Sequence, residues 1–205
     1  NGRAGADAMY GYAGDDTYHV DDAGDAVNEA VGGGNDTVIA TVSYALAAGQ
    51  EVETLRTMGS ATTGAIDLTG NEYANTLFGN AAANRLDGGQ GADMMYGFGG
   101  DDTYFVDDAG DRVVEAADGG NDTVIADASY ALGAGQSVET LRTRGSATTY
   151  AVDLAGNDVA NTIVGNAAAN LIDGKGGADV LRGYGGADIF AFTTALGAGN
   201  VDLIV

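Results

Sequence analysis

The chain contains no cysteine and no proline, and each absence removes a class of structure. Without cysteine there is no disulfide framework and no thiolate metal site. Without proline, the 35 glycines cannot belong to a collagen-like triple helix. An extracellular domain that lacks disulfides needs another staple, and bound metal ions are the usual substitute.

Basic residues are scarce: eight lysines and arginines stand against 30 acids, which gives a formal net charge of −22. Nucleic acids are therefore poor partners, because binding them depends on basic side chains that neutralise phosphates. Cations are good partners, and a merely solubilising acidic surface is the simpler alternative. The one histidine, His19, has Phe105 at the position 86 residues later, so we expect a strand side chain and no enzyme.

Long apolar runs are also missing, so the sequence predicts no membrane span. The first residues show neither a signal-peptide pattern nor an initiator methionine, and the sequence begins inside a motif at residues 1–7. We expect it to be a fragment of a longer protein.

What the sequence does contain is a repeat of 86 residues. Segments 5–7, 91–93 and 177–179 are all Gly-Ala-Asp, and the match between copies has no gaps. Roughly 60 of the 86 paired positions are identical. We therefore predict two units, 1–86 and 87–172, and the start of a third at 173–205 with a C-terminal closing-type segment, all in one continuous solenoid.

A period of nine lies inside each unit, as in GGQGADMMY-GFGGDDTYF at 88–105 and GKGGADVLR-GYGGADIFA at 174–191. Position six is Asp or Asn, and position eight is a large apolar residue. One apolar residue in nine is too sparse for a helix face and favours a short strand with one inward side chain after a glycine turn. The stretches 42–63 and 128–149 lose the strict nine but keep strand-like runs at 52–57 and 138–143, which we interpret as longer coils of the same solenoid.

The loop pattern G-G-x-G-x-D supplies the ligands that calcium prefers, since calcium takes six to eight oxygens from carboxylates and backbone carbonyls. Glycine adopts positive φ without strain, so the loop turns tightly. If two nonapeptides make one turn, loops 18 residues apart stack about 4.8 Å apart and share an ion. The predicted stacked pairs are Asp7 with Asp25, Asp16 with Asp36, Asp93 with Asp111, and Asp102 with Asp122; Asp179 and Asp188 begin a third set.

The predicted metal ligands are these ten aspartates together with loop glycines Gly5, Gly14, Gly89, Gly91, Gly100, Gly177 and Gly186. The pairs that end at Asp36 and Asp122 are less regular, because two extra residues interrupt the nine before those loops: Glu29-Ala30 and Glu115-Ala116.

These nonapeptides resemble the G-G-x-G-x-D-x-U-x repeats of RTX (repeats-in-toxin) proteins, which form calcium-binding parallel β-helices. The resemblance implies an all-β, right-handed parallel β-roll with several calcium ions in its turns. It also implies type I secretion and folding outside the cell. Residues 187–202 are similar to the segment that closes such rolls.

Some loops depart from the pattern. Asn75, Asn84, Asn161 and Asn170 replace the aspartate, and we expect metal-free loops in which each amide bonds to its stacked copy, with weak metal sites as the alternative. Residues other than glycine occupy the second loop position, and we expect their side chains to point outward: Arg3, Tyr12, Phe98, Lys175 and Tyr184.

Two functions remain open. The first is a calcium-binding extracellular structural protein of a surface, matrix, adhesin or filament, which would associate end to end through its open strand edges. The second is the C-terminal secretion and folding module of an exported hydrolase such as a metalloprotease or lipase.

Overall fold

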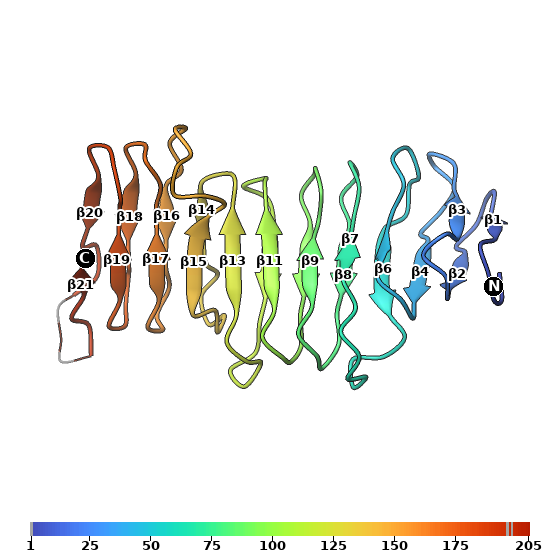
Figure 1. Cartoon of the computed structure of the whole chain (residues 1–205), viewed down its shortest axis with the longest axis horizontal. Helices are drawn as coiled ribbons and strands as arrows, with labels where there is room; N and C mark the ends of the chain where they lie inside the picture. The colour runs from blue at the N-terminus through green and yellow to red at the C-terminus, as the bar shows by residue number, and fades with distance from the viewer. Residues whose placement is uncertain (1, 196, 198) are drawn as a thin grey trace.

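The computed structural model describes residues 2–195, 197 and 199–205, and in them it confirms an all-β parallel solenoid (Figure 1). The described residues form 21 short strands and no helix, at two strands per turn and about ten turns. Figure 1 shows the strands following one another along the long axis from the N-terminus to the C-terminus. Every named strand pairs with its sheet neighbours in parallel.

One face carries the odd-numbered strands: β1 Ala8–Tyr10, β3 Ala26–Asn28, β5 Tyr44–Ala45, β7 Leu68–Thr69, β9 Arg85–Asp87, β11 Thr103–Val106, β13 Thr123–Ala126, β15 Thr140–Thr143, β17 Thr162–Val164, β19 Val180–Arg182 and β21 Leu203–Ile204. The other face carries the even-numbered strands: β2 Thr17–Val20, β4 Thr37–Ala40, β6 Thr54–Thr57, β8 Thr76–Phe78, β10 Met94–Tyr96, β12 Arg112–Val114, β14 Tyr130–Ala131, β16 Leu154–Ala155, β18 Leu171–Asp173 and β20 Ile189–Ala191. The loops before odd strands therefore lie along one edge, and those before even strands along the other.

The predicted register of 18 residues per turn is confirmed where nonapeptides follow one another. Met94 pairs with Arg112 on one side of β10 and with Thr76 on the other. The longer coils also belong to the solenoid, since Thr54 of β6 pairs with Thr37 of β4 and with Thr76 of β8. Insertions are therefore absorbed in the loops, and the strand ladder continues through them.

The core is a single column of inward side chains between the two faces. A strand of three residues typically has one buried side chain flanked by two outer ones, because successive side chains point to opposite faces. The residues at position eight are buried: Leu77, Leu86, Met95, Tyr104, Val113, Ile163, Ile172 and Leu181. Phe190, the last of the predicted series, is only partly buried because few turns cover it.

The 86-residue unit holds nine strands, which is an odd number. The segment Thr17–Val20 is β2 on the even face, whereas its counterpart Thr103–Val106 is β11 on the odd face. Successive units are therefore related by a half-turn about the solenoid axis, and equivalent residues of the two units lie on opposite faces and edges.

Each face is interrupted once, at equivalent places of the two units. The odd-face ladder breaks between β3 and β5, and the even-face ladder breaks between β12 and β14. A tyrosine hydroxyl spans each break: Tyr44 donates to the carbonyl of Asp25 at 3.0 Å, and Tyr130 accepts from the N–H of Val113 at 3.2 Å. These buried tyrosines replace the missing ladder bonds.

The predicted closing-type segment, residues 187–202, contributes β20 to the stack, and β21 follows it directly and pairs in parallel with β19. Leu196 and Ala198 of that segment lie outside the described residues.

Candidate metal centre

Glycine loops connect the strands along both edges, and all seven predicted ligand glycines have positive φ. The angles lie between 82° and 113° for Gly5, Gly14, Gly89, Gly91, Gly100, Gly177 and Gly186. Such angles are costly for other residues, so the turn requires glycine there.

Five non-glycine residues also adopt positive φ, between 66° and 76°: Arg3, Tyr12, Phe98, Lys175 and Tyr184. Left-handed backbone costs an L-residue about 1–2 kcal/mol, which the stacked loops must offset. The aromatic side chains of this group point outward as predicted, with Tyr12 76% exposed and Tyr184 50% exposed. Lys175 also reaches back to an ion pair with Asp173 at 2.7 Å.

The aspartates at position six join consecutive turns through hydrogen bonds. In each predicted pair, Oδ1 of the later aspartate accepts the backbone N–H of the earlier one: Asp7 to Asp25 and Asp93 to Asp111 at 2.9 Å, Asp16 to Asp36 and Asp102 to Asp122 at 2.8 Å. The predicted stacking of these loops is therefore observed. One carboxylate oxygen acts as a clamp, which leaves the second oxygen to be accounted for.

In seven of the ten aspartates this second oxygen is buried and has no hydrogen-bond partner among the described residues. They are Asp7, Asp16, Asp36, Asp93, Asp102, Asp122 and Asp179, each through Oδ2. Burying a carboxylate oxygen without a partner costs several kcal/mol, so isolated cases are rare and a regular series needs a compensating ligand. A hard cation such as calcium fits this donor set, since it accepts carboxylate oxygens from stacked loops.

The other three aspartates differ. Asp25 accepts backbone N–H groups on both oxygens, with Oδ2 taking those of Asp21 at 3.2 Å and Asp22 at 3.3 Å, and Asp111 is bonded in the same way. These two side chains therefore mainly stabilise the turn by accepting backbone hydrogen bonds. Asp188 is half-buried and accepts the N–H of Asn170 at 3.0 Å.

Burial also changes the acidity of these groups. Loss of water, reinforced by neighbouring acids, raises the pKa of Asp93, Asp102 and Asp122 to about 7 and that of Asp179 to about 6. Their ordinary pKa is 3.8. The loops therefore hold negative charge reluctantly unless a proton or a cation neutralises it.

The asparagine loops are satisfied without any ion. Asn84 Nδ2 donates to the carbonyl of Ile66 at 2.9 Å, and its Oδ1 accepts the N–H of Asn80 at 2.7 Å. Asn75, Asn161 and Asn170 make equivalent bonds. The expectation that each amide bonds to a stacked asparagine is wrong, because a turn of 18 residues stacks Asn84 against Asp102.

Two glutamates join the aspartate loops, although the sequence pattern treats them only as interruptions of the repeat. Glu29 lies with Asp16 and Asp36, and one oxygen of each residue falls within 4.8 Å of the others. Glu115 forms the same group with Asp102 and Asp122. The signal that could have identified them is recurrence, since both glutamates reappear at the 86-residue period.

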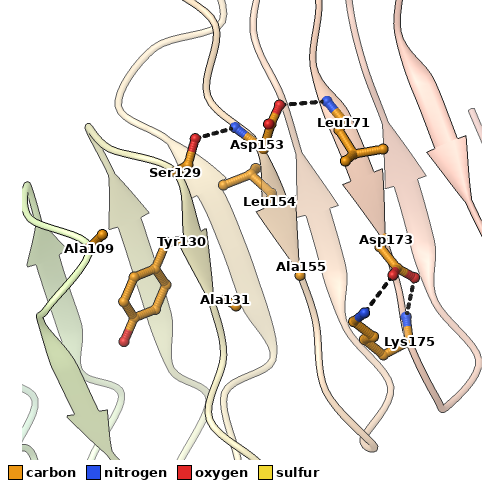
Figure 2. Close-up of a pocket in the computed structure, with 10 residues that line it drawn as sticks. All are labelled: Ala109, Ser129, Tyr130, Ala131, Asp153, Leu154, Ala155, Leu171, Asp173 and Lys175. Atoms are coloured by element: carbon orange, nitrogen blue, oxygen red, sulfur yellow. Dashed lines mark hydrogen bonds and ion pairs between the residues drawn. The ribbon is translucent and has the colours of Figure 1, made fainter. Parts of the chain in front are cut away.

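A surface pocket lies away from these loops, where the even face is interrupted near β14 (Figure 2). Its polar groups bond among themselves: Ser129 accepts from the N–H of Asp153, and Asp153 accepts from the N–H of Leu171, both at 2.9 Å. Figure 2 also shows the contact between Asp173 and Lys175. The acids of this pocket are therefore already engaged, and it is a weaker candidate for a cation than the loops.

His19 is exposed on β2, as a strand-surface side chain. Within the described part of the chain, no helix has the length and apolar character needed to cross a membrane.

The family comparison agrees with the loops. A family model described as the RTX calcium-binding nonapeptide repeat (4 copies) matches residues 1–26, 69–104 and 154–190. Comparisons with curated proteins and with solved structures gave no match. The matched segments contain the strict nonapeptides, and the longer coils between them are joined to the same solenoid by strand pairing.

Proposed function

This chain is an RTX calcium-binding nonapeptide-repeat protein, and we propose that it is an extracellular structural scaffold that folds when calcium enters its stacked loops. The single observation that carries the proposal is the series of seven buried aspartate oxygens without partners. A fold that regularly buries such oxygens needs positive charge beside them.

The aspartate side chains would divide their work between two oxygens. Oδ1 holds the preceding turn through a backbone N–H, as in Asp122 with Asp102, and Oδ2 is presented to the ion. The positive-φ glycines would add backbone carbonyls to the ligand shell. Calcium, when bound, supplies the charge that lets neighbouring acidic loops stack.

An extracellular location follows from this dependence on calcium. The chain carries a net charge of −22 and repels itself when compact. Binding free energy then becomes folding free energy. Extracellular calcium modules typically bind at about 0.1–1 mM, a concentration found outside cells.

A structural role is favoured by the repeat itself. The acids that line the loops recur in both units, which suits ligands and clamps, whereas catalysis needs an asymmetric group of side chains. The RTX solenoid is a structural repeat, and in this chain we propose that it acts as a rod. The ends of its sheets expose strand edges that a second copy could extend.

The alternative is the secretion and folding module of an exported hydrolase. The added strand β21, which extends the odd face over residues 203–204, is the observation that favours it. A scaffold should associate end to end in calcium, and a folding module should stay monomeric. Analytical ultracentrifugation of the calcium-loaded chain, followed by electron microscopy, distinguishes the two.

The folding proposal is tested by far-UV circular dichroism during a calcium titration from a chelated start. We expect a cooperative transition from coil to β-structure at micromolar to millimolar calcium, with magnesium ineffective at the same concentrations. A chain that is already fully β in chelator, and whose melting temperature calcium does not raise, would exclude the proposal.

A further inference from the structure

Glu115 lies outside the strict nonapeptides, yet its side chain reaches the space between two stacked calcium loops. It follows β12 directly, and one of its oxygens lies within 4.8 Å of carboxylate oxygens of both Asp102 and Asp122. All three side chains are buried, with exposures of 3%, 1% and 0%. Three buried acids therefore lie close together there.

Two of these carboxylates have an oxygen with nothing to bond. Oδ2 of Asp102 and Oδ2 of Asp122 have no hydrogen-bond partner in the part of the chain that the structure describes, although each Oδ1 accepts a backbone N–H, from Asn84 and from Asp102 respectively. The clamps fix the carboxylates, so the free oxygens cannot turn away to water. A cation is the ligand that this arrangement lacks.

The third carboxylate is held in place from several sides. The hydroxyl of Tyr104 donates to Oε2 of Glu115, and the N–H of Ala116 donates to Oε1. The backbone N–H of Glu115 itself donates to the side-chain oxygen of Gln136 at 2.6 Å. This preorganisation is what a ligand needs and what a loosely solvated surface glutamate lacks.

Gly97 keeps the space open. A Cβ on this glycine would overlap both Oδ2 of Asp102 and the hydroxyl of Tyr104. Gly11 stands in the same relation to Asp16, Tyr18 and Glu29. The tyrosine, the glycine and the acids therefore belong to one local structure that both units contain.

We propose that Asp102, Glu115 and Asp122 form a three-carboxylate calcium site, repeated in the first unit by Asp16, Glu29 and Asp36. This rests on the proposed calcium-dependent folding and assigns its tightest sites. Among the described residues, other stacked loops such as that of Asp93 on Asp111 have no third acid within the same distance.

The two sites lie on opposite edges of the solenoid. Asp102 and Asp122 precede odd-numbered strands, whereas Asp16 and Asp36 precede even-numbered strands, because the unit contains nine strands. Each unit thus has one such site, which joins two stacked loops, and the sites of successive units lie on opposite edges of the solenoid. More carboxylate ligands raise calcium affinity, so these sites should fill before the others.

The test uses terbium, which replaces calcium in oxygen sites and emits when a tyrosine lies beside it. We expect sensitised emission from the intact chain at low terbium, displaced by calcium. In the double variant Glu29→Gln, Glu115→Gln the amide oxygen can accept the backbone N–H of the next residue while its NH2 group donates to the tyrosine oxygen, so the side chain keeps its size and its neighbours but loses its charge. The affinity of the two three-carboxylate sites for terbium and calcium should fall on the order of tenfold or more, while the chain still folds at higher calcium concentration.

The matched control is Asp118→Asn, which removes an exposed acid from the same loop as Glu115 and Asp122 and leaves all three proposed ligands in place. Should the double variant fail to fold, Glu115→Gln alone leaves the first-unit site intact. The number of tightly bound ions per chain should then fall from two to one. A glutamine variant that still folds with calcium and has unchanged affinity and emission would show that Glu29 and Glu115 are not ligands, and would leave the proposed function standing. If the unaltered chain did not bind calcium at all, the proposed function itself would be overturned.

Discussion

The calcium-free chain should become more stable as the pH falls from 8 to 5.5, which is the reverse of ordinary acid denaturation. Burial raises the pKa of Asp93, Asp102 and Asp122 to about 7 in the folded chain, against an ordinary value of 3.8. A group whose pKa is higher in the folded state binds more protons there. Its stabilisation is fully present below the unfolded pKa and is lost as the pH rises through the folded value.

The magnitude is large enough to decide whether the apo chain folds. The difference between about 7 and 3.8 corresponds to about 4 kcal/mol for each carboxylate, and to on the order of 10 kcal/mol for the three together. An entire domain is usually stable by only about 5–15 kcal/mol. This gain accumulates as the pH falls from about 7 to about 4, so between pH 8 and 5.5 about half of it is realised, about 2 kcal/mol for each carboxylate and about 6 kcal/mol in total. In chelator we therefore expect coil at pH 8 and more β-structure at pH 5.5.

The assay is far-UV circular dichroism and urea unfolding in chelator across this pH range, repeated with saturating calcium. Calcium should reverse the sign, because protons then compete with the ion for the same oxygens and weaken binding as the pH falls. The variant Asp102→Asn, Asp122→Asn should remove about two thirds of the calcium-free pH dependence, because Asp93 keeps its share, whereas Asp118→Asn should leave the dependence unchanged. A calcium-free chain that is equally stable at pH 5.5 and 8, or more stable at 8, would show that burial does not raise the pKa of these aspartates.

Three further predictions concern single positions. Leu141→Ala should cost about 2–5 kcal/mol in calcium, since Leu141 is fully buried; urea unfolding that shows a loss below about 1 kcal/mol would contradict the single-column core. Gly97→Ala should raise the calcium concentration at the midpoint of folding, because the added Cβ would push the Asp102 carboxylate aside. Gly59→Ala, whose Cβ has no atom within 4 Å, should leave this midpoint unchanged. Equal midpoints for the two variants would show that Gly97 does not hold the site open. Asn84→Asp loses an amide donor to a backbone carbonyl and should destabilise the chain by about 1–3 kcal/mol in thermal melts, with calcium and without it; rescue by calcium would show that this loop can become a metal site.

Much of the fold could be predicted from the spacing of residues alone. The period of nine fixes one inward side chain per strand, so the sequence pattern is enough to assign Leu86 and Leu181 to the core. The stacking of Asp93 on Asp111 follows from two nonapeptides per turn. These features depend on local geometry, which the spacing of residues determines directly.

Features that depend on counting strands were harder to foresee. The half-turn between units requires the number of strands in the longer coils, where β5 and β14 have only two residues each and little periodic signal. The position of Glu29 and Glu115 beside the aspartates was missed for a related reason. Both sit in insertions, and only the three-dimensional path of the chain brings them to the loops.

Calcium should lie beside the seven aspartate oxygens that have no partner among the described residues, and a crystal structure of the calcium-loaded chain tests this placement. Anomalous difference density, with terbium exchanged for calcium to strengthen the signal, should appear next to Oδ2 of Asp7, Asp16, Asp36, Asp93, Asp102, Asp122 and Asp179. The loops of Asn75, Asn84, Asn161 and Asn170 should show none. Peaks at the asparagine loops would contradict this placement. Aspartate loops without a peak, in which Oδ2 bonds to another group of the chain, would contradict it as well.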